Sequence, residues 1–179
     1  MRRASLLLIT SAAVAAPAAA ARADAWAAAP RTIEAQVGIA SPLGLGVAVD
    51  VAPVRWLSVG AGVGRSATAA QVAGCVRARP WAGPRRALYL GACVSAGGYR
   101  EPTPSDATYR EAARAWWASP ELGIEWRSGG VAARVFAGPT FLLNPDAVHC
   151  TGADLAGCEA GETWGTSMPF GGVAIGWAF

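Results

Sequence analysis

The chain has 179 residues, which suits a single domain, and its formal net charge of +3 gives no basic surface of the kind that binds nucleic acid. It is 53% hydrophobic, with a mean hydropathy of +0.31. Beyond residue 25, however, no apolar run is long enough to form a membrane-spanning helix. The apolar side chains therefore either fill a large core or face lipid, and a β-barrel achieves the second without any long apolar run.

The N-terminal segment has the three parts of a secretory signal peptide. Met1-Arg2-Arg3 is basic, residues 4–21 are almost entirely apolar, and Ala23-Asp24-Ala25 is an Ala-x-Ala cleavage sequence. The alternative is a transmembrane anchor, but the apolar run is rich in Ala rather than Leu. We therefore predict a signal peptide over residues 1–25, cleaved after Ala25, and one domain over residues 26–179.

Alternating residues dominate the rest of the chain. Between positions 43 and 51, for example, every odd-numbered residue is Leu or Val and every even-numbered residue is Gly, Ala or Asp. This period of two is typical of a strand with one apolar face. We predict eight strands, at residues 32–39, 43–51, 56–64, 72–79, 88–96, 115–127, 131–137 and 168–179. Pro120 and Pro139 fit poorly, because proline removes a donor from the hydrogen-bond ladder.

The connections between these strands fall into two sets, one for each end of the sheet. One set, which includes the longest connections, lies at residues 41–42, 65–70, 99–113 and 144–166, although its first member is unusually short. The other set consists of shorter turns, at residues 53–55, 80–84 and 128–130. An even number of strands with long loops on one side and short turns on the other is the pattern of a membrane barrel. The predicted fold class is therefore all-β, an eight-stranded antiparallel up-and-down transmembrane β-barrel.

Aromatic residues cluster near both ends of the predicted strands, as they do at the two interfaces of a membrane. Near the short turns and the C-terminal residue lie Trp56, Trp81, Trp126, Trp177 and Phe179. Near the long loops lie Tyr99, Trp116, Trp117, Phe141 and Trp164. Two such belts favour a membrane barrel over a soluble one, in which Trp would be expected in the core.

The last seven residues, Val173-Ala-Ile-Gly-Trp-Ala-Phe179, place aromatic and branched side chains on one face and small ones on the other. Together with the alternation and the aromatic belts, this ending resembles the small eight-stranded outer-membrane β-barrels of the OmpX and OmpA-transmembrane-domain type. The resemblance implies the outer membrane of a Gram-negative bacterium, with membrane lipid and lipopolysaccharide as partners. It also implies that the barrel-assembly machinery reads a signal formed by Val173, Ile175, Trp177 and Phe179. The family includes passive or adhesive barrels and lipid-modifying enzymes, and no signature places this chain in either branch.

Polar side chains occupy the strand face that a membrane barrel turns inward. The charged residues of this face are Glu34, Asp50, Arg77, Arg79, Glu121, Glu125, Arg127 and Arg134. An eight-stranded barrel is only wide enough for side chains to fill it, and charges in such a place need partners. We therefore predict an Arg–carboxylate network that plugs the lumen, rather than a pore. Room for these long side chains would come from Gly44, Gly46, Gly60, Gly62 and Gly64.

Four cysteines in an exported chain suggest two disulfides. Cys75 and Cys93 share the inward face of neighbouring predicted strands, on either side of the 80–84 turn. Cys150 and Cys158 share the last long loop. We predict the bridges Cys75–Cys93 and Cys150–Cys158. The rival interpretation is a metal site, but a single His and the lack of a Cys-x-x-Cys sequence favour no metal and no cofactor.

Catalysis would need His149 as a base beside a nucleophile such as Thr166 or Ser167, and nothing in their spacing supports this. We therefore predict no enzyme activity. The predicted role is structural or surface interaction, with an unidentified surface partner bound through the loops at 99–113 and 144–166. Two alternatives remain: a lipid- or lipopolysaccharide-modifying barrel enzyme, and a soluble periplasmic barrel that binds a small apolar ligand. The soluble barrel requires an apolar lumen and a polar exterior.

Overall fold

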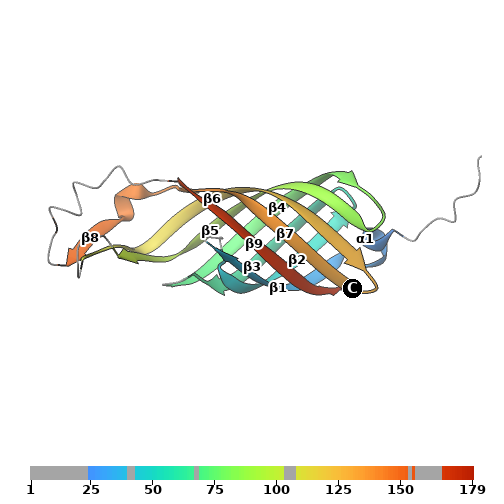
Figure 1. Cartoon of the computed structure of the whole chain (residues 1–179), viewed down its shortest axis with the longest axis horizontal. Helices are drawn as coiled ribbons and strands as arrows, with labels where there is room; N and C mark the ends of the chain where they lie inside the picture. The colour runs from blue at the N-terminus through green and yellow to red at the C-terminus, as the bar shows by residue number, and fades with distance from the viewer. Residues whose placement is uncertain (1–23, 40–42, 67–68, 103–107, 153–154, 156–166) are drawn as a thin grey trace, which may run out of the picture.

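The computed structural model describes residues 24–39, 43–66, 69–102, 108–152, 155 and 167–179. Its elements are α1 (Ala25–Ala28), β1 (Arg31–Ile39), β2 (Leu45–Val54), β3 (Leu57–Arg65), β4 (Ala70–Ala82), β5 (Arg86–Pro102), β6 (Thr108–Ser128), β7 (Val131–Leu142), η1 (Pro145–Ala147), β8 (His149–Gly152) and β9 (Ser167–Ala178). Within this part of the chain, β1 to β7 and β9 form one antiparallel barrel, and β8 lies outside it (Figure 1).

The barrel closes because the first strand pairs with the last. β1 and β9 pair from Thr32–Ala178 to Ile39–Gly171. The remaining strands pair in chain order, with β7 next to β9 because β8 stands aside. A closed sheet leaves no free edge around its wall. The predicted all-β, eight-stranded, antiparallel up-and-down barrel is thus confirmed as a fold.

The two ends of the barrel differ in their connections. The turns β2–β3, β4–β5 and β6–β7 lie at one end, beside α1 and the C-terminal residue (Figure 1). We call this the turn end and the opposite end the loop end. β5 and β6 are longer than their neighbours and project beyond the barrel at the loop end (Figure 1).

The prediction of a polar loop over residues 99–113 is wrong. β5 continues to Pro102 and β6 begins at Thr108, and they pair from Tyr99–Ala112 to Pro102–Tyr109. β8 then pairs with the same part of β6, from Thr108–Gly152 to Glu111–His149. A hairpin that leaves the barrel wall has no continuous apolar face. The period of two that identified the other strands is therefore missing from its sequence.

Two predicted turns also begin later than expected. β2 runs through Pro53 to Val54, and β4 runs through Pro80 to Ala82. In both cases the strand register shifts around the proline, between Val51 and Val54 and between Ala78 and Trp81. A bulge tolerates proline because one residue there makes no ladder bond. Proline therefore marked an irregularity in each strand rather than its end.

Pro120 and Pro139 are accommodated by a common gap in the ladder between β6 and β7. The paired residues stop at Ala118–Phe141 and resume at Leu122–Ala137 in the same register. Both prolines are exposed on the outer face of this gap. On the inner face, the hydroxyls of Ser119 and Thr140 lie 2.7 Å apart and hydrogen-bond across it. One side-chain bond thus links the two strands where backbone pairs are missing.

In the part of the chain that the structure describes, no helix has the length and apolar character needed to cross a membrane.

Candidate functional site

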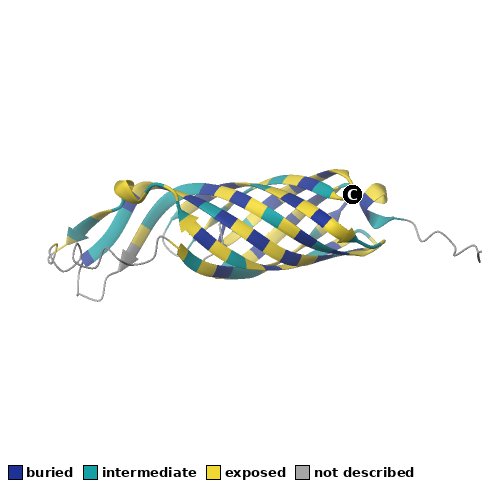
Figure 2. Cartoon of the chain, turned by 90° about the horizontal axis from the view of Figure 1, so that it is seen from above, coloured by how far each residue is buried: buried dark blue, intermediate teal, exposed yellow. Residues whose placement is uncertain are grey.

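The outer surface of the barrel is apolar on every strand. Figure 2 shows exposed and buried residues alternating along the wall. One large apolar residue from each barrel strand, between 45% and 53% exposed, illustrates this: Ile33, Val49, Val59, Val76, Leu90, Leu122, Val135 and Val173. Soluble monomers rarely expose contiguous apolar patches larger than a few hundred Å². This surface therefore needs an apolar environment.

Exposed aromatic side chains lie at both ends of this apolar surface. Those at the turn end are Trp56, Trp81, Trp177 and Phe179, and those towards the loop end are Trp116 and Phe141. Trp126 is half-buried. Trp117 and Tyr99 were predicted for the belt but turn inward, with ring centroids 5.6 Å apart, so their assignment is corrected. Trp164 lies outside the described residues.

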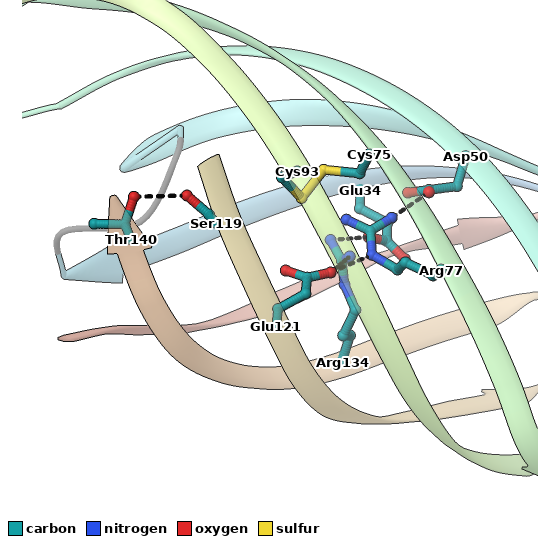
Figure 3. The surroundings of a disulfide bond; sticks show 9 residues. All are labelled: Glu34, Asp50, Cys75, Arg77, Cys93, Ser119, Glu121, Arg134 and Thr140. Atoms are coloured by element: carbon teal, nitrogen blue, oxygen red, sulfur yellow. Dashed lines mark hydrogen bonds and ion pairs between the residues drawn. A yellow bond between two sulfur atoms is a disulfide. The ribbon is translucent and has the colours of Figure 1, made fainter. Parts of the chain in front are cut away.

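The lumen holds all eight charged residues predicted for it, each at most 5% exposed. Five of them form a first ion-pair group: Glu34, Asp50, Arg77, Glu121 and Arg134 (Figure 3). Arg77 pairs with Asp50 and donates from Nε to Glu121 Oε1 at 2.5 Å. Arg134 Nη2 lies 2.9 Å from Glu34 Oε2 and its Nη1 lies 3.9 Å from Glu121 Oε1. A continuous series of contacts thus connects two arginines and three carboxylates.

The second ion-pair group lies nearer the turn end and contains Arg79, Glu125 and Arg127. Arg79 donates from Nε and Nη2 to Glu125 Oε2, at 3.0 and 2.9 Å, and from Nη2 to the hydroxyl of Ser58. Arg127 donates from Nε to the other oxygen, Glu125 Oε1, at 3.1 Å. Across the two groups, four arginines face four carboxylates, so the lumen is electrically balanced. Charge balance is one of the conditions under which buried charges are tolerated.

Of the five glycines predicted to make room for the charged side chains, only Gly60 does so. At the other four, Gly44, Gly46, Gly62 and Gly64, a Cβ atom would first meet backbone atoms or apolar side chains, so the prediction is wrong for them. A Cβ atom at Gly60 would meet the carboxylate of Asp50, and one at Gly91 would lie 2.8 Å from Glu121 Cγ and 3.1 Å from Arg77 Cγ. Gly91 was not among the glycines predicted for this role. Its parity with Tyr89 and Cys93 on the inward face of β5 could have identified it.

The space left in the lumen is small. A cavity beside the first ion-pair group has about 20 Å³ for water and is lined by Gln36, Leu43, Arg134 and the Cys75–Cys93 pair, among others. A single water needs roughly 10–15 Å³ by the same measure. This cavity has room for about one water molecule and none for an apolar ligand.

Trp26 closes the lumen at the turn end. Its side chain is 1% exposed and its Nε1 donates to Gly83 O at 3.0 Å. The guanidinium carbons of Arg79 and Arg127 lie 4.4 and 4.3 Å from the centroid of its ring. Cations at such distances over a Trp face are attracted by its π-electrons. Trp26 precedes the first predicted strand, at residues 32–39, and no sequence pattern predicted this contact.

Replacing Trp26 with Ala is expected to lower the free energy of unfolding by about 3–5 kcal/mol, the usual cost of truncating a buried Trp. The reason is the loss of packing against both guanidiniums and of the Gly83 hydrogen bond. Urea unfolding in detergent or lipid measures this change in the free energy of unfolding. Trp26→Phe keeps a ring but no N–H and should lose clearly less. Equal stability of all three proteins would contradict a plug at this position.

Cys75 and Cys93 form a disulfide between directly opposed residues of β4 and β5, with 4.1 Å between their Cα atoms (Figure 3). The bond lies in the lumen next to the first ion-pair group. For the other predicted bridge, Cys158 lies outside the described residues, so Cys150–Cys158 stays a prediction.

The Cys75→Ala, Cys93→Ala double variant is expected to be less stable than the parent by about 3 kcal/mol, from the loop of this length that the bond closes. The measurement is the urea midpoint of both proteins with and without reductant. Because the variant lacks this bond, reduction of the bond can no longer shift its urea midpoint. The matched Cys150→Ala, Cys158→Ala variant keeps the lumen bond and should keep that dependence. A parent midpoint equal to that of the lumen variant would contradict the prediction.

The projecting part of the sheet is anchored by its own small core. We define the outer extension as Tyr99–Pro102 of β5, Thr108–Ala112 of β6 and β8. At its base a cluster of apolar side chains contains Tyr99, Ala112, Ala115, Trp117, Leu142, Val148 and Met168. On its surface, Arg100 lies 4.1 Å from the ring centroid of Tyr109 and 3.7 Å from a carboxylate oxygen of Glu111. The apolar cluster joins the extension to the barrel, and the surface contacts join β5 to β6 within the extension.

Two of the three residues considered for catalysis, His149 and Ser167, lie on different strands with different partners. His149 is exposed on β8 and pairs with Glu111 of β6, whereas Ser167 pairs with Phe141 across β9 and β7. Thr166 lies outside the described residues. Among the residues with described positions, no group of three His, Cys, Asp or Glu side chains is arranged to hold a metal ion.

These features define a closed, charge-filled, eight-stranded barrel with an apolar wall. Solved structures that resemble it include CarO2 and CarO of Acinetobacter baumannii. For CarO2 the TM-score is 0.42 with 14% identity, covering 84% of this chain and 99% of that one. For CarO the TM-score is 0.43 with 12% identity, covering 83% of this chain and 97% of that one. No model of a protein family matches the sequence, and no curated protein matches it.

Proposed function

We propose that this chain is a small, closed barrel of the Gram-negative outer membrane, with a structural or surface-interaction role at its loop end. The observation that carries the proposal is the inversion of the two faces of its wall. Large apolar side chains point outward from every barrel strand, and paired charges point inward. A soluble ligand-binding barrel needs the opposite arrangement, because its exterior meets water and its lumen meets the ligand.

The lumen argues against transport as the role. Arginine–carboxylate pairs cross it in two groups, Trp26 covers its turn end, and the cavity beside them has about 20 Å³ for water. A barrel of eight strands has no central channel once its side chains are in place. The surface available for function is therefore the outer extension, together with the 144–166 segment, which is where we place contact with lipopolysaccharide or a surface partner.

The proposed orientation puts the loop end outside the cell, and a matched pair of cysteine variants tests it. Ser66→Cys lies between β3 and β4 at the loop end, and Ser128→Cys lies at the β6–β7 turn. A bulky, membrane-impermeant maleimide added to intact cells should label the first variant only, and both after the cells are lysed. Labelling of Ser128→Cys in intact cells would reverse the orientation. Labelling of both in a soluble fraction would refute the location.

A trimmed variant tests the role. Replacing residues 99–112 with a tight turn removes the hairpin of the outer extension but leaves the barrel strands intact. In a strain lacking the chain, detergent sensitivity reports a structural role and attachment to surfaces reports an interaction. We expect the trimmed variant to restore detergent resistance but not attachment. If deletion of the whole chain causes neither detergent sensitivity nor loss of attachment, both proposed roles are refuted.

A further inference from the structure

The segment before β1 is built into the turn end of the barrel, and its contacts begin at Asp24. The Asp24 carboxylate accepts a hydrogen bond from the backbone N–H of Trp26 at 3.0 Å and caps α1. Its other oxygen lies 3.6 Å from Nε of Arg55, in the β2–β3 turn. The backbone N–H of Ala25 donates to Pro84 O in the β4–β5 turn at 3.1 Å. Both residues therefore tie α1 to neighbouring turns.

The residues that follow continue this attachment into the lumen. Trp26 lies against Arg79 and Arg127, and Arg127 Nη1 donates to Ala29 O at 2.5 Å. The position of Trp26 thus depends on the chain before it as well as on the lumen below it. A mature protein that kept Trp26 but lacked its cap would lose part of this arrangement.

Cleavage after Ala25, the site predicted from the sequence, would remove five contacts. It would delete the Asp24 cap, the Asp24–Arg55 ion pair and the Ala25–Pro84 hydrogen bond. Within α1, it would delete the hydrogen bonds from Ala28 N–H to Asp24 O and from Ala29 N–H to Ala25 O. It would also turn the neutral amide of Trp26 into an ammonium group. That charge would sit on a buried residue whose ring already lies against two guanidiniums, with the nearby carboxylate of Asp24 removed. Burying a charge without its partner is costly.

We propose instead that signal peptidase hydrolyses the Ala23–Asp24 bond, so that Asp24 is the first residue of the mature protein. Ala21-Arg22-Ala23 supplies the small residues at the −3 and −1 positions that such cleavage requires. Water adds across the peptide bond: Ala23 leaves on the signal peptide as a carboxylate, and Asp24 keeps the new α-ammonium group. The side-chain carboxylate of Asp24 then lies on the same residue as the new charge. This inference rests on the export that the proposed function requires.

The direct test is the N-terminus of the mature protein. The full-length chain is expressed in a Gram-negative host, purified from the cell envelope, and analysed by intact mass and by sequencing of its N-terminal peptide. We expect a single species that begins at Asp24. A species that begins at Trp26, or at any other residue, overturns the proposal.

A matched pair of variants tests the same bond by another route. Ala23→Leu places a large residue at −1 and is expected to accumulate the uncleaved precursor or to shift the N-terminus. Ala25→Leu alters only the second residue after the cut and is expected to be processed at Asp24 like the parent. The reverse pattern would overturn the proposal. Cleavage before Asp24 in a protein that is soluble in the periplasm would refute the outer-membrane location but leave this inference intact. An uncleaved chain would refute the inference wherever the barrel lies.

Discussion

The variant Leu122→Arg is expected to destabilise the barrel in lipid by about 2–4 kcal/mol, the cost of a cation at the middle of the bilayer. Leu122 is 51% exposed on β6, midway between Trp116 at one end of the apolar surface and Trp126 at the other. The introduced guanidinium would replace an outward-facing apolar side chain. The measurement is reversible urea unfolding in phospholipid vesicles.

Leu143→Arg is the matched control for this variant. Leu143 is 54% exposed, similar to Leu122, but it follows β7 beyond Phe141 at the loop end. Because the cost falls towards the interface, we expect a change of about 1 kcal/mol or less. In a soluble barrel both positions would face water, and both substitutions would stay within about 0.5 kcal/mol. Equal small effects at the two positions would therefore contradict a lipid-facing wall.

The variant Arg77→Met is expected to cost about 3–5 kcal/mol, the range found when one partner of a buried ion pair is removed. Arg77 bridges Asp50 and Glu121 in the first ion-pair group. Without it, Asp50 loses the guanidinium that neutralises it, and Glu121 keeps only the more distant Arg134 at 3.9 Å. The same unfolding experiment measures this effect.

Two further variants show whether the cost comes from unpaired charge. Arg114→Met removes an exposed arginine from β6 and should change stability by no more than about 0.5 kcal/mol. The triple variant Arg77→Met, Asp50→Asn, Glu121→Gln removes the charges together and should recover most of the loss. A single Arg77→Met variant as stable as the parent would mean that the lumen does not depend on this group.

The inward and outward faces of the strands could be predicted because the period of two is a local property. Leu122 and Glu121 are adjacent in the sequence, and their opposite faces follow from the pleat alone. The contacts within the lumen could not be predicted in this way. Glu34 on β1 meets Arg134 on β7 across the intervening β9, and Arg77 on β4 meets Glu121 on β6 across β5. These pairs depend on the stagger and tilt of the closed sheet, which parity does not encode.

Two features were missed for different physical reasons. The strands of the outer extension carry consecutive polar residues such as Arg110 and Glu111, without the alternation of the barrel strands, and were therefore predicted to be a loop. Trp26 stands in an Ala-rich stretch without any period. The signal that could have identified it is Asp24 two residues earlier, since Asp is a preferred residue at the start of a helix. A Trp that follows such a cap predicts a segment that packs against the barrel, rather than an unattached N-terminal segment.

The most direct test of a closed barrel embedded in lipid is heat-modifiable migration of the protein from outer-membrane fractions. A closed antiparallel barrel keeps its hydrogen bonds in dodecyl sulfate until it is boiled, because its wall has no free edge at which to open. We predict that the protein partitions with the outer membrane and that its gel mobility changes on boiling. Recovery in the soluble periplasmic fraction, with the same mobility before and after boiling, would contradict the account.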